Sequence, residues 1–150
     1  MEISNKNVIV TGGANGIGKA LAKAFKNAGA SYILIADLDE TEGQRTADEL
    51  GIKFKKTDVS SESDIIELIA TANNDTKSID IFCSNAGIGG APMLLDVSTE
   101  DWQNIWEINV MSHIYAAKNV LPQMIEKGSG YLMNTASAAG LLTQVGAAPY

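Results

Sequence analysis

The sequence predicts an α/β protein built on a doubly wound parallel sheet. Three observations support this: short β-branched runs alternate with longer helical segments, a glycine cluster follows the first run, and an aspartate follows the second. Repeated strand–helix units need right-handed crossovers, which generate parallel strands. No repeat or low-complexity linker interrupts the sequence, so residues 1–150 are expected to form a single domain.

The first half of the chain is expected to hold three strands and two helices. The strands are predicted at residues 8–11, 32–36 and 52–57, and the helices at residues 16–28 and 39–50. The run YILIA is apolar throughout, as expected for a parallel strand covered on both faces. The first helix carries an apolar stripe of Ile17, Leu21, Phe25 and Ala28 and stops before Gly29. The third strand alternates weakly, which is typical of a sheet edge.

The second half continues the same alternation. Ser60 or Ser61 is expected to cap a helix that carries Ile65, Ile66, Leu68 and Ile69, and a fourth strand is predicted at residues 79–84. Ser98 and Asp101 resemble a capping box that opens a long helix to about Lys127. Trp102 and Trp106 are interpreted as packing anchors near its start.

A fifth strand is predicted at residues 131–135, with five strands visible in all and no helix after the fifth. Because a complete fold of this type has six strands, the chain is expected to be incomplete at its C-terminal end. Apolar side chains of the first, fourth and fifth strands (Val8, Val10, Ile79, Ile81 and Leu132) are then expected to lose part of their cover.

Composition excludes several classes of protein. The chain is 45% hydrophobic and 19% charged with a formal net charge of −7, and its basic residues are scattered, which disfavours nucleic acid and anionic membranes as partners. No signal-like or membrane-spanning stretch is present, so a cytoplasmic location is expected. Cys83 is predicted to be a buried, reduced thiol, and His113 a packing or surface residue rather than a metal ligand.

The glycine cluster between the first strand and first helix is a candidate phosphate site. Gly12, Gly16 and Gly18 let the backbone turn tightly and approach a pyrophosphate, while the helix N-terminus offers free N–H groups. The spacing differs from the commoner G-x-G-x-x-G, so a merely flexible turn is the alternative for this motif alone. The position favours a Rossmann-like nucleotide-binding fold.

Asp37 follows the second strand and indicates the cofactor. A carboxylate there can accept hydrogen bonds from both ribose hydroxyls of adenosine and repels a 2′-phosphate. Asn15, rather than a basic residue, precedes Gly16, so the sequence predicts NAD rather than NADP. Taken alone, Asp37 could equally be a turn former or a helix cap.

These motifs, with four more, resemble the classical short-chain dehydrogenases/reductases over the whole chain. The pieces are T-G-G-A-N-G-I-G, Asp58-Val59, Asn85-Ala86-Gly87, Asn109, Ser137, and Tyr150 thirteen residues beyond that serine. Each piece is weak alone, but their order and their places on the expected elements agree.

The resemblance implies a role for each position. The cofactor-binding residues would be Gly12, Asn15, Gly16, Ile17, Gly18, Asp37, Asp58, Val59, Asn85, Ala86 and Gly87. Ser137 would orient the substrate oxygen, Tyr150 would be the general acid/base, and Asn109 would hold a water in a proton relay. A phenol has a pKa of about 10, so the family lowers it with a lysine one helical turn after the tyrosine. The chain ends at Tyr150, so the fragment itself is expected to be inactive.

The sequence therefore predicts an NAD-dependent oxidoreductase acting on an alcohol or ketone, without a metal. Family members usually assemble as dimers or tetramers, so a homo-oligomer is expected. The substrate pocket would draw on residues 88–97 and 138–149. A non-catalytic nucleotide-binding module is the main alternative. A methyltransferase that uses S-adenosylmethionine is disfavoured by the form of the glycine loop and by Ser137 and Tyr150.

Overall fold

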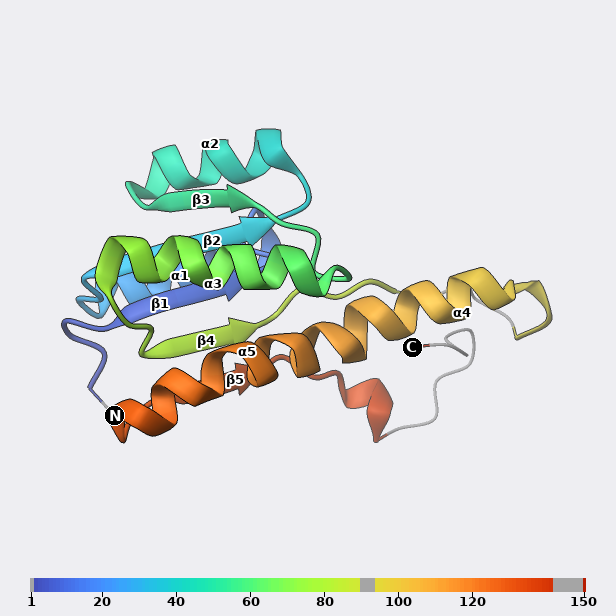
Figure 1. Ribbon diagram of the computed structural model, residues 1–150. Helices are drawn as coiled ribbons and strands as arrows, with labels where there is room; N and C mark the ends of the chain where they lie inside the picture. The colour runs from blue at the N-terminus through green and yellow to red at the C-terminus, as the bar shows by residue number, and fades with distance from the viewer. Residues whose placement is uncertain (1, 90–93, 142–149) are drawn as a thin grey trace.

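Five parallel strands form one sheet in the computed structural model, which describes residues 2–89, 94–141 and 150 (Figure 1). The strand order is β3-β2-β1-β4-β5, so β3 and β5 are the edges. The strands are β1 (Asn7–Thr11), β2 (Tyr32–Asp37), β3 (Lys53–Lys56), β4 (Ile81–Ser84) and β5 (Tyr131–Asn134). The predicted fold class is confirmed, and the fourth strand begins two residues later than expected.

Helices cover both faces of this sheet. They are α1 (Gly16–Asn27), α2 (Glu40–Leu50), α3 (Glu62–Thr76), α4 (Thr99–Trp106) and α5 (Ser112–Lys127). One core cluster joins α1 and α2 to side chains such as Val10 and Ile35, and a second joins α3 and α5 to Ile9 and Phe82. Alternate residues of β1 therefore enter opposite cores, which explains its uninterrupted apolar sequence. Cys83 is buried in the first of these clusters, as expected.

Local sequence sets where the helices begin and end. The side chains of Asp39, Ser61 and Ser98 each accept a hydrogen bond from the backbone N–H three residues on, and Ser98 with Asp101 completes the expected capping box. Ser61, not Ser60, is therefore the cap of α3. Gly51 and Gly128 end α2 and α5 in the left-handed conformation.

The apolar stripe expected on α1 is confirmed at Phe25 and partly at Leu21, which packs against the core, but is wrong at Ile17 and Ala28. The buried positions are Gly18, Ala22 and Phe25, whereas Ile17 is 64% exposed and Ala28 is exposed. Close packing of Gly18 on the preceding loop turns that face of the helix inward. On α3, Ile65, Leu68 and Ile69 are buried, whereas Ile66 is 47% exposed.

The long helix after Ser98 is interrupted by a π-helical turn at Glu107–Met111, which apolar spacing did not predict. The packing role expected for Trp102 and Trp106 is wrong, because these side chains are 39% and 52% exposed. Figure 1 shows the reason: α4 extends beyond the ends of the strands, where no sheet lies beneath it.

The expected loss of cover over the central strands is also wrong. Val8, Val10, Ile79 and Ile81 are at most 1% exposed, because α1, α3 and α5 already enclose them. Leu132 packs against the α3–α5 cluster. In the part of the chain that the structure describes, the edge strand β5 does lack cover: Leu132 is only half-buried, and on the opposite face Tyr131 is 50% and Met133 is 39% exposed. Among the described residues, no helix has the length and apolar character needed to cross a membrane.

Asp80, just before β4, links this strand to β1 and to the end of α5. Its carboxylate lies 2.5 Å from the Lys127 ammonium and 3.9 Å from that of Lys6, and it accepts the backbone N–H of Asn7 at 2.9 Å. Burial opposes its ionisation, but Lys127, the Asn7 N–H and Lys6 outweigh that effect and hold the pKa of Asp80 below its ordinary value. The group therefore ties β1, β4 and the end of α5 together.

Replacing Asp80 with Asn should lower the free energy of unfolding by roughly 2–3 kcal/mol at neutral pH, because the largely buried carboxylate that pairs with Lys127 is replaced by a neutral amide. The pKa of Asp80 is lower in the folded protein than the value of about 3.9 expected in the unfolded chain. The carboxylate therefore contributes its full stabilisation at pH values above about 3.9, and this stabilisation is lost as the pH falls through the pKa of the folded state. Urea unfolding of Asp80→Asn and wild type across this range should show the difference shrinking with acid. Asp96→Asn, at an exposed carboxylate, is the matched control. A difference that stays constant in acid would contradict this account.

Candidate functional site

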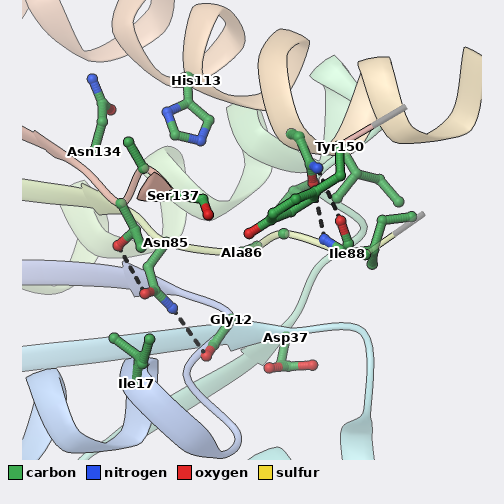
Figure 2. Close-up of a pocket in the computed structure, with 18 of the residues that line it drawn as sticks. Gly12, Ile17, Asp37, Asn85, Ala86, Ile88, His113, Asn134, Ser137 and Tyr150 are labelled. Carbon is green, nitrogen blue, oxygen red and sulfur yellow. Dashed lines mark hydrogen bonds between the residues drawn. The ribbon is translucent and has the colours of Figure 1, made fainter. Parts of the chain in front are cut away.

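A cavity of about 1090 Å³ opens at the carboxyl ends of the strands, where the chain order reverses between β1 and β4 (Figure 2). Ligands of doubly wound sheets bind at this reversal. Every residue that the sequence assigns to the site lines the cavity except Gly16: Gly12, Asn15, Ile17, Gly18, Asp37, Asp58, Val59, Asn85, Ala86, Gly87, Asn109, Ser137 and Tyr150. Residues 90–93 and 142–149 of the expected substrate pocket lie outside the described residues.

Asn85 and Thr11 hold the floor of the cavity together. The Thr11 hydroxyl accepts hydrogen bonds from the backbone N–H groups of Asn85 at 3.0 Å and Ala86 at 3.1 Å. The Asn85 amide donates to the carbonyls of Thr11 at 3.0 Å and Gly12 at 3.4 Å, and its oxygen accepts from the Thr135 hydroxyl at 2.9 Å (Figure 2). The ends of β1, β4 and β5 are thereby fixed to one another.

The glycine loop needs its glycines for packing as well as for turning. Gly12 has a φ of +65°, and a Cβ there would lie 2.9 Å from Ala86 Cα. A Cβ on Gly18 would lie 1.9 Å from the Gly12 carbonyl oxygen and 2.7 Å from the Asn85 amide nitrogen. Both positions therefore exclude any side chain unless the loop moves.

Gly18→Ala should consequently destabilise the protein by roughly 2–3 kcal/mol, as expected for overpacking against backbone. The displaced loop should also weaken NADH binding. Gly140→Ala is the matched control, because a Cβ there meets no described residue within 4 Å. Thermal unfolding and NADH titration of both variants check this. Equal stability of the two variants would show that the loop accommodates a methyl group.

The N-terminus of α1 faces the cavity with unused donors. Its first turn carries no acidic residue, and the Asn15 cap makes no side-chain hydrogen bond to the helix. The Lys19 N–H donates the first intrahelical bond, to the Asn15 carbonyl, so the preceding N–H groups have no partner within the helix. Ile17 and Gly18 from this turn line the cavity. These donors fit a pyrophosphate, and the size of the cavity fits a dinucleotide.

Carboxylates mark one end of the cavity. Asp37 accepts the N–H of Ala14 at 3.0 Å and the N–H of Asp39 at 3.1 Å, so it holds the glycine loop against the end of β2. Asp58 accepts the N–H and hydroxyl of Ser60 at 2.9 and 2.7 Å. The described lining of the cavity contains neither Lys nor Arg. This end suits the hydroxyls of a ribose and disfavours an added phosphate.

The other end of the cavity is lined by side chains from α5, such as His113, and from the segment after β5, such as Ser137. Ser137 caps a short 3₁₀ turn at Ala138–Gly140, and its Oγ accepts the Ala139 N–H at 3.1 Å. The acceptor side of this hydroxyl is therefore engaged, while its proton can be donated into the cavity. Tyr150 lines the same cavity and is 48% exposed.

Asn109 lies in the π-helical turn and has both ends of its side chain engaged. Its Oδ1 accepts the Ile88 N–H at 2.9 Å, and its Nδ2 donates to the Ile88 carbonyl at 2.9 Å (Figure 2). The side chain thus fixes the chain that leaves β4 beside the cavity. A π-helical turn displaces backbone carbonyls from the regular hydrogen-bond register and is frequent at functional sites.

Sequence reasoning missed several lining residues: Leu38, Thr57, Ile108, His113, Asn134, Thr135 and Ala136. His113 is the most consequential, because it lines the cavity instead of serving only in packing or at the surface. Burial lowers the pKa of the His113 imidazole below its ordinary value, although the Asn134 side chain partly opposes this. Leu38, Thr57, Asn134 and Thr135 could have been found from one signal, namely their position at or just after strand ends.

Fold and site together define the class of protein: a Rossmann-like α/β protein with a glycine-rich phosphate loop and an acid at the end of β2. Residues 6–150 match the family model described as short chain dehydrogenase, so the chain belongs to this family of oxidoreductases, whose members depend on nicotinamide cofactors.

Similar proteins agree with this assignment. An uncharacterized oxidoreductase of Bacillus subtilis, YvrD, is 34% identical over 145 residues, covering 94% of this chain and 54% of that protein. One from Staphylococcus saprophyticus is 33% identical over 150 residues, covering 99% of this chain and 61% of that protein. The chain thus spans little more than half the length of these relatives.

Two solved structures share the fold closely. A short chain dehydrogenase/reductase from Burkholderia phymatum in complex with NAD has a TM-score of 0.96 and 29% identity, covering 100% of this chain and 55% of that one. A 3-ketoacyl-(acyl-carrier-protein) reductase from Brucella melitensis complexed with NADH has a TM-score of 0.94 and 28% identity, covering 99% of this chain and 64% of that one.

Proposed function

We propose that this protein is an NAD-dependent oxidoreductase that transfers a hydride between the nicotinamide and an alcohol or ketone. One observation carries the proposal: Ser137 and Tyr150 line the same cavity as Asp37 and the glycine loop. Two hydroxyl groups suited to a substrate oxygen therefore share a space with the groups suited to a dinucleotide.

The proposed cofactor site uses the free N–H groups before Lys19 for the pyrophosphate and Asp37 for the adenosine ribose. Asp58 and Val59 flank the adenine, and the segment from Asn85 to Gly87 passes near the ribose. Asn15 and Gly16 complete the loop, although Gly16 contributes its backbone rather than a cavity-lining surface. The two carboxylates and the lack of Lys and Arg in the described lining favour NAD over NADP.

When bound, the nicotinamide supplies the hydride in reduction or accepts it in oxidation. Ser137 donates its hydroxyl proton in a hydrogen bond to the substrate oxygen, and the Ala139 N–H that one of its lone pairs accepts strengthens the hydroxyl as a donor. Tyr150 gives a proton to that oxygen in reduction and removes one in oxidation. Asn109 holds Ile88 with its side chain, so in the proposed proton relay its backbone carbonyl holds the water.

These 150 residues are proposed to be one dinucleotide-binding domain of a longer cytoplasmic protein. The cation that activates the tyrosine in this family would then lie outside the sequence printed here, so the 150-residue chain by itself would not turn over. An assay of NADH oxidation with a panel of small neutral ketones tests both the proposed activity of the full-length protein and the proposed inactivity of the 150-residue chain. The full-length protein should oxidise NADH, and the 150-residue chain should not. NADH binding without turnover of any ketone by the full-length protein would favour a non-catalytic nucleotide-binding module.

We also propose that the protein forms a homo-oligomer through the outer face of α5. Ile114, Leu121 and Ile125 recur on one side of this helix and are 47%, 39% and 74% exposed, whereas Ala116, Val120 and Met124 on the other side are buried. Ile125→Glu should therefore shift the full-length protein toward monomer in sedimentation. Glu126→Gln, at the next position, should leave the state unchanged. An unaltered state in Ile125→Glu would place the interface elsewhere.

A further inference from the structure

His113 stands at the corner of the cavity where the substrate oxygen is proposed to bind. It lies on α5, about one turn after Asn109, and lines the cavity together with Asn134, Ala136 and Ser137. Figure 2 shows its ring projecting from α5 toward the side of the cavity that carries Ser137. The polar ring of His113 therefore faces the part of the cavity beside Ser137, where substrate atoms next to the reacting carbon would lie.

The imidazole keeps hydrogen-bonding capacity for a ligand. It has two ring nitrogens, each able to donate or accept a hydrogen bond, and the nearby Asn134 side chain raises its pKa without cancelling the effect of burial. Neither nitrogen is a fully buried, unpaired atom among the described residues, and the ring lines the cavity. The neighbouring Ser112 is different, because it is buried and its hydroxyl donates to the Ile108 carbonyl at 2.6 Å. Contacts within the protein therefore account for the Ser112 hydroxyl. The ring nitrogens of His113, in contrast, can form hydrogen bonds with a ligand in the cavity.

The charge around His113 indicates what it would bind. Burial lowers the pKa of its imidazole, which favours the neutral ring with one donor and one acceptor. Among the described residues the lining contains no Lys or Arg, and its carboxylates are Asp37 and Asp58. The groups around His113 in this part of the chain therefore match a hydroxyl or carbonyl oxygen better than a carboxylate or phosphate.

We infer that His113 is a specificity-determining residue that hydrogen-bonds a second oxygen of the substrate, close to the carbon whose oxygen Ser137 holds. The substrate class is then uncharged alcohols and ketones with a neighbouring hydroxyl or carbonyl, such as α-hydroxy ketones, 1,2-diols and 1,2-diketones. A neutral imidazole serves both oxidation states of that second oxygen, because it can donate to a carbonyl or accept from a hydroxyl. This inference rests on the proposed function.

The kinetic test compares butane-2,3-dione with butan-2-one, two ketones of similar size that differ in the second oxygen. In the full-length protein with NADH, His113→Phe should lower kcat/KM for the dione about tenfold and that for butan-2-one by less than about threefold. His113→Gln, which keeps a donor and an acceptor, should retain most of the activity on the dione. Equal losses on both ketones in His113→Phe, or no rescue by Gln, would overturn the inference.

A binding test needs no turnover. In the full-length protein with NAD⁺, neither ketone can be reduced, so a ketone that binds forms a stable complex. The ring signals of His113 are assigned by their absence from the NMR spectrum of His113→Gln. Butane-2,3-dione should shift these signals and butan-2-one should not; unmoved signals at saturating dione would refute the role of His113. Failure of the proposed function is distinct, since wild type would then oxidise no NADH with either ketone.

Discussion

Replacing Tyr150 with Phe in the full-length protein is expected to lower kcat/KM for a ketone roughly 10²- to 10⁴-fold, the range that general acid–base catalysis supplies. The change removes only the phenolic oxygen, so the substrate oxygen loses its proton donor while the shape of the cavity is kept. Steady-state kinetics of NADH oxidation measures the loss. The dissociation constant for NADH should stay within about twofold, because this residue is not among the proposed cofactor contacts.

Tyr131→Phe is the matched control for this variant. Tyr131 is also partly exposed, but it lies on β5 and outside the candidate site. Its loss of a hydroxyl should leave the kinetics unchanged. If Tyr150→Phe retained wild-type kcat/KM, the proton would have to come from another group, and the assignment of Tyr150 as acid/base would be wrong.

Asp37→Asn is expected to raise the affinity for NADPH about tenfold or more relative to NADH, because it removes a negative charge from the site of the 2′-phosphate. Wild type should prefer NADH by tens- to hundreds-fold, equivalent to about 2–3 kcal/mol. Asparagine keeps an oxygen that can accept the Ala14 N–H, so the glycine loop should stay in place. Titration of both proteins with NADH and NADPH measures the preference.

Glu126→Gln is the control that separates the loss of charge at the cofactor site from a change in the net charge of the protein. It also removes one negative charge, but from an exposed position near the end of α5 and outside the cavity. Its preference for NADH should equal that of wild type. Equal affinities of the wild-type protein for NADH and NADPH would show that Asp37 does not select the cofactor.

Local sequence was enough to predict the strands, the helix caps and the positions of side chains at the strand ends. A short apolar run such as YILIA, bounded by turn residues, favours a strand covered on both faces, and a side chain such as Ser98 caps a helix through atoms three residues away. Asp37 was placed at the end of β2 by the same reasoning, since the apolar run ends where the acid begins. These features depend on neighbours within one turn or one strand.

Features that depend on distant residues could not be predicted in this way. Whether Trp102 packs is determined by how far α4 runs past the sheet, which its own spacing does not encode. The Asn109 side chain bonds the backbone of Ile88, twenty-one residues earlier in the chain, and the π-helical turn that positions it has no periodic signature. His113 was assigned to packing or the surface because no second metal ligand accompanies it in the sequence, and the residues that line the cavity beside it, such as Asn134 and Ser137, lie on other elements.

Transfer of deuterium from NADH deuterated on the nicotinamide C4 tests the central claim most directly. The full-length protein is incubated with a neutral ketone and each of the two C4-labelled forms of NADH in turn, and the product alcohol is analysed by mass spectrometry and NMR. The account predicts one deuterium on the carbinol carbon with one labelled form and none with the other. Tight NADH binding with no labelled alcohol from any ketone tested would contradict it and indicate a nucleotide-binding module without hydride transfer.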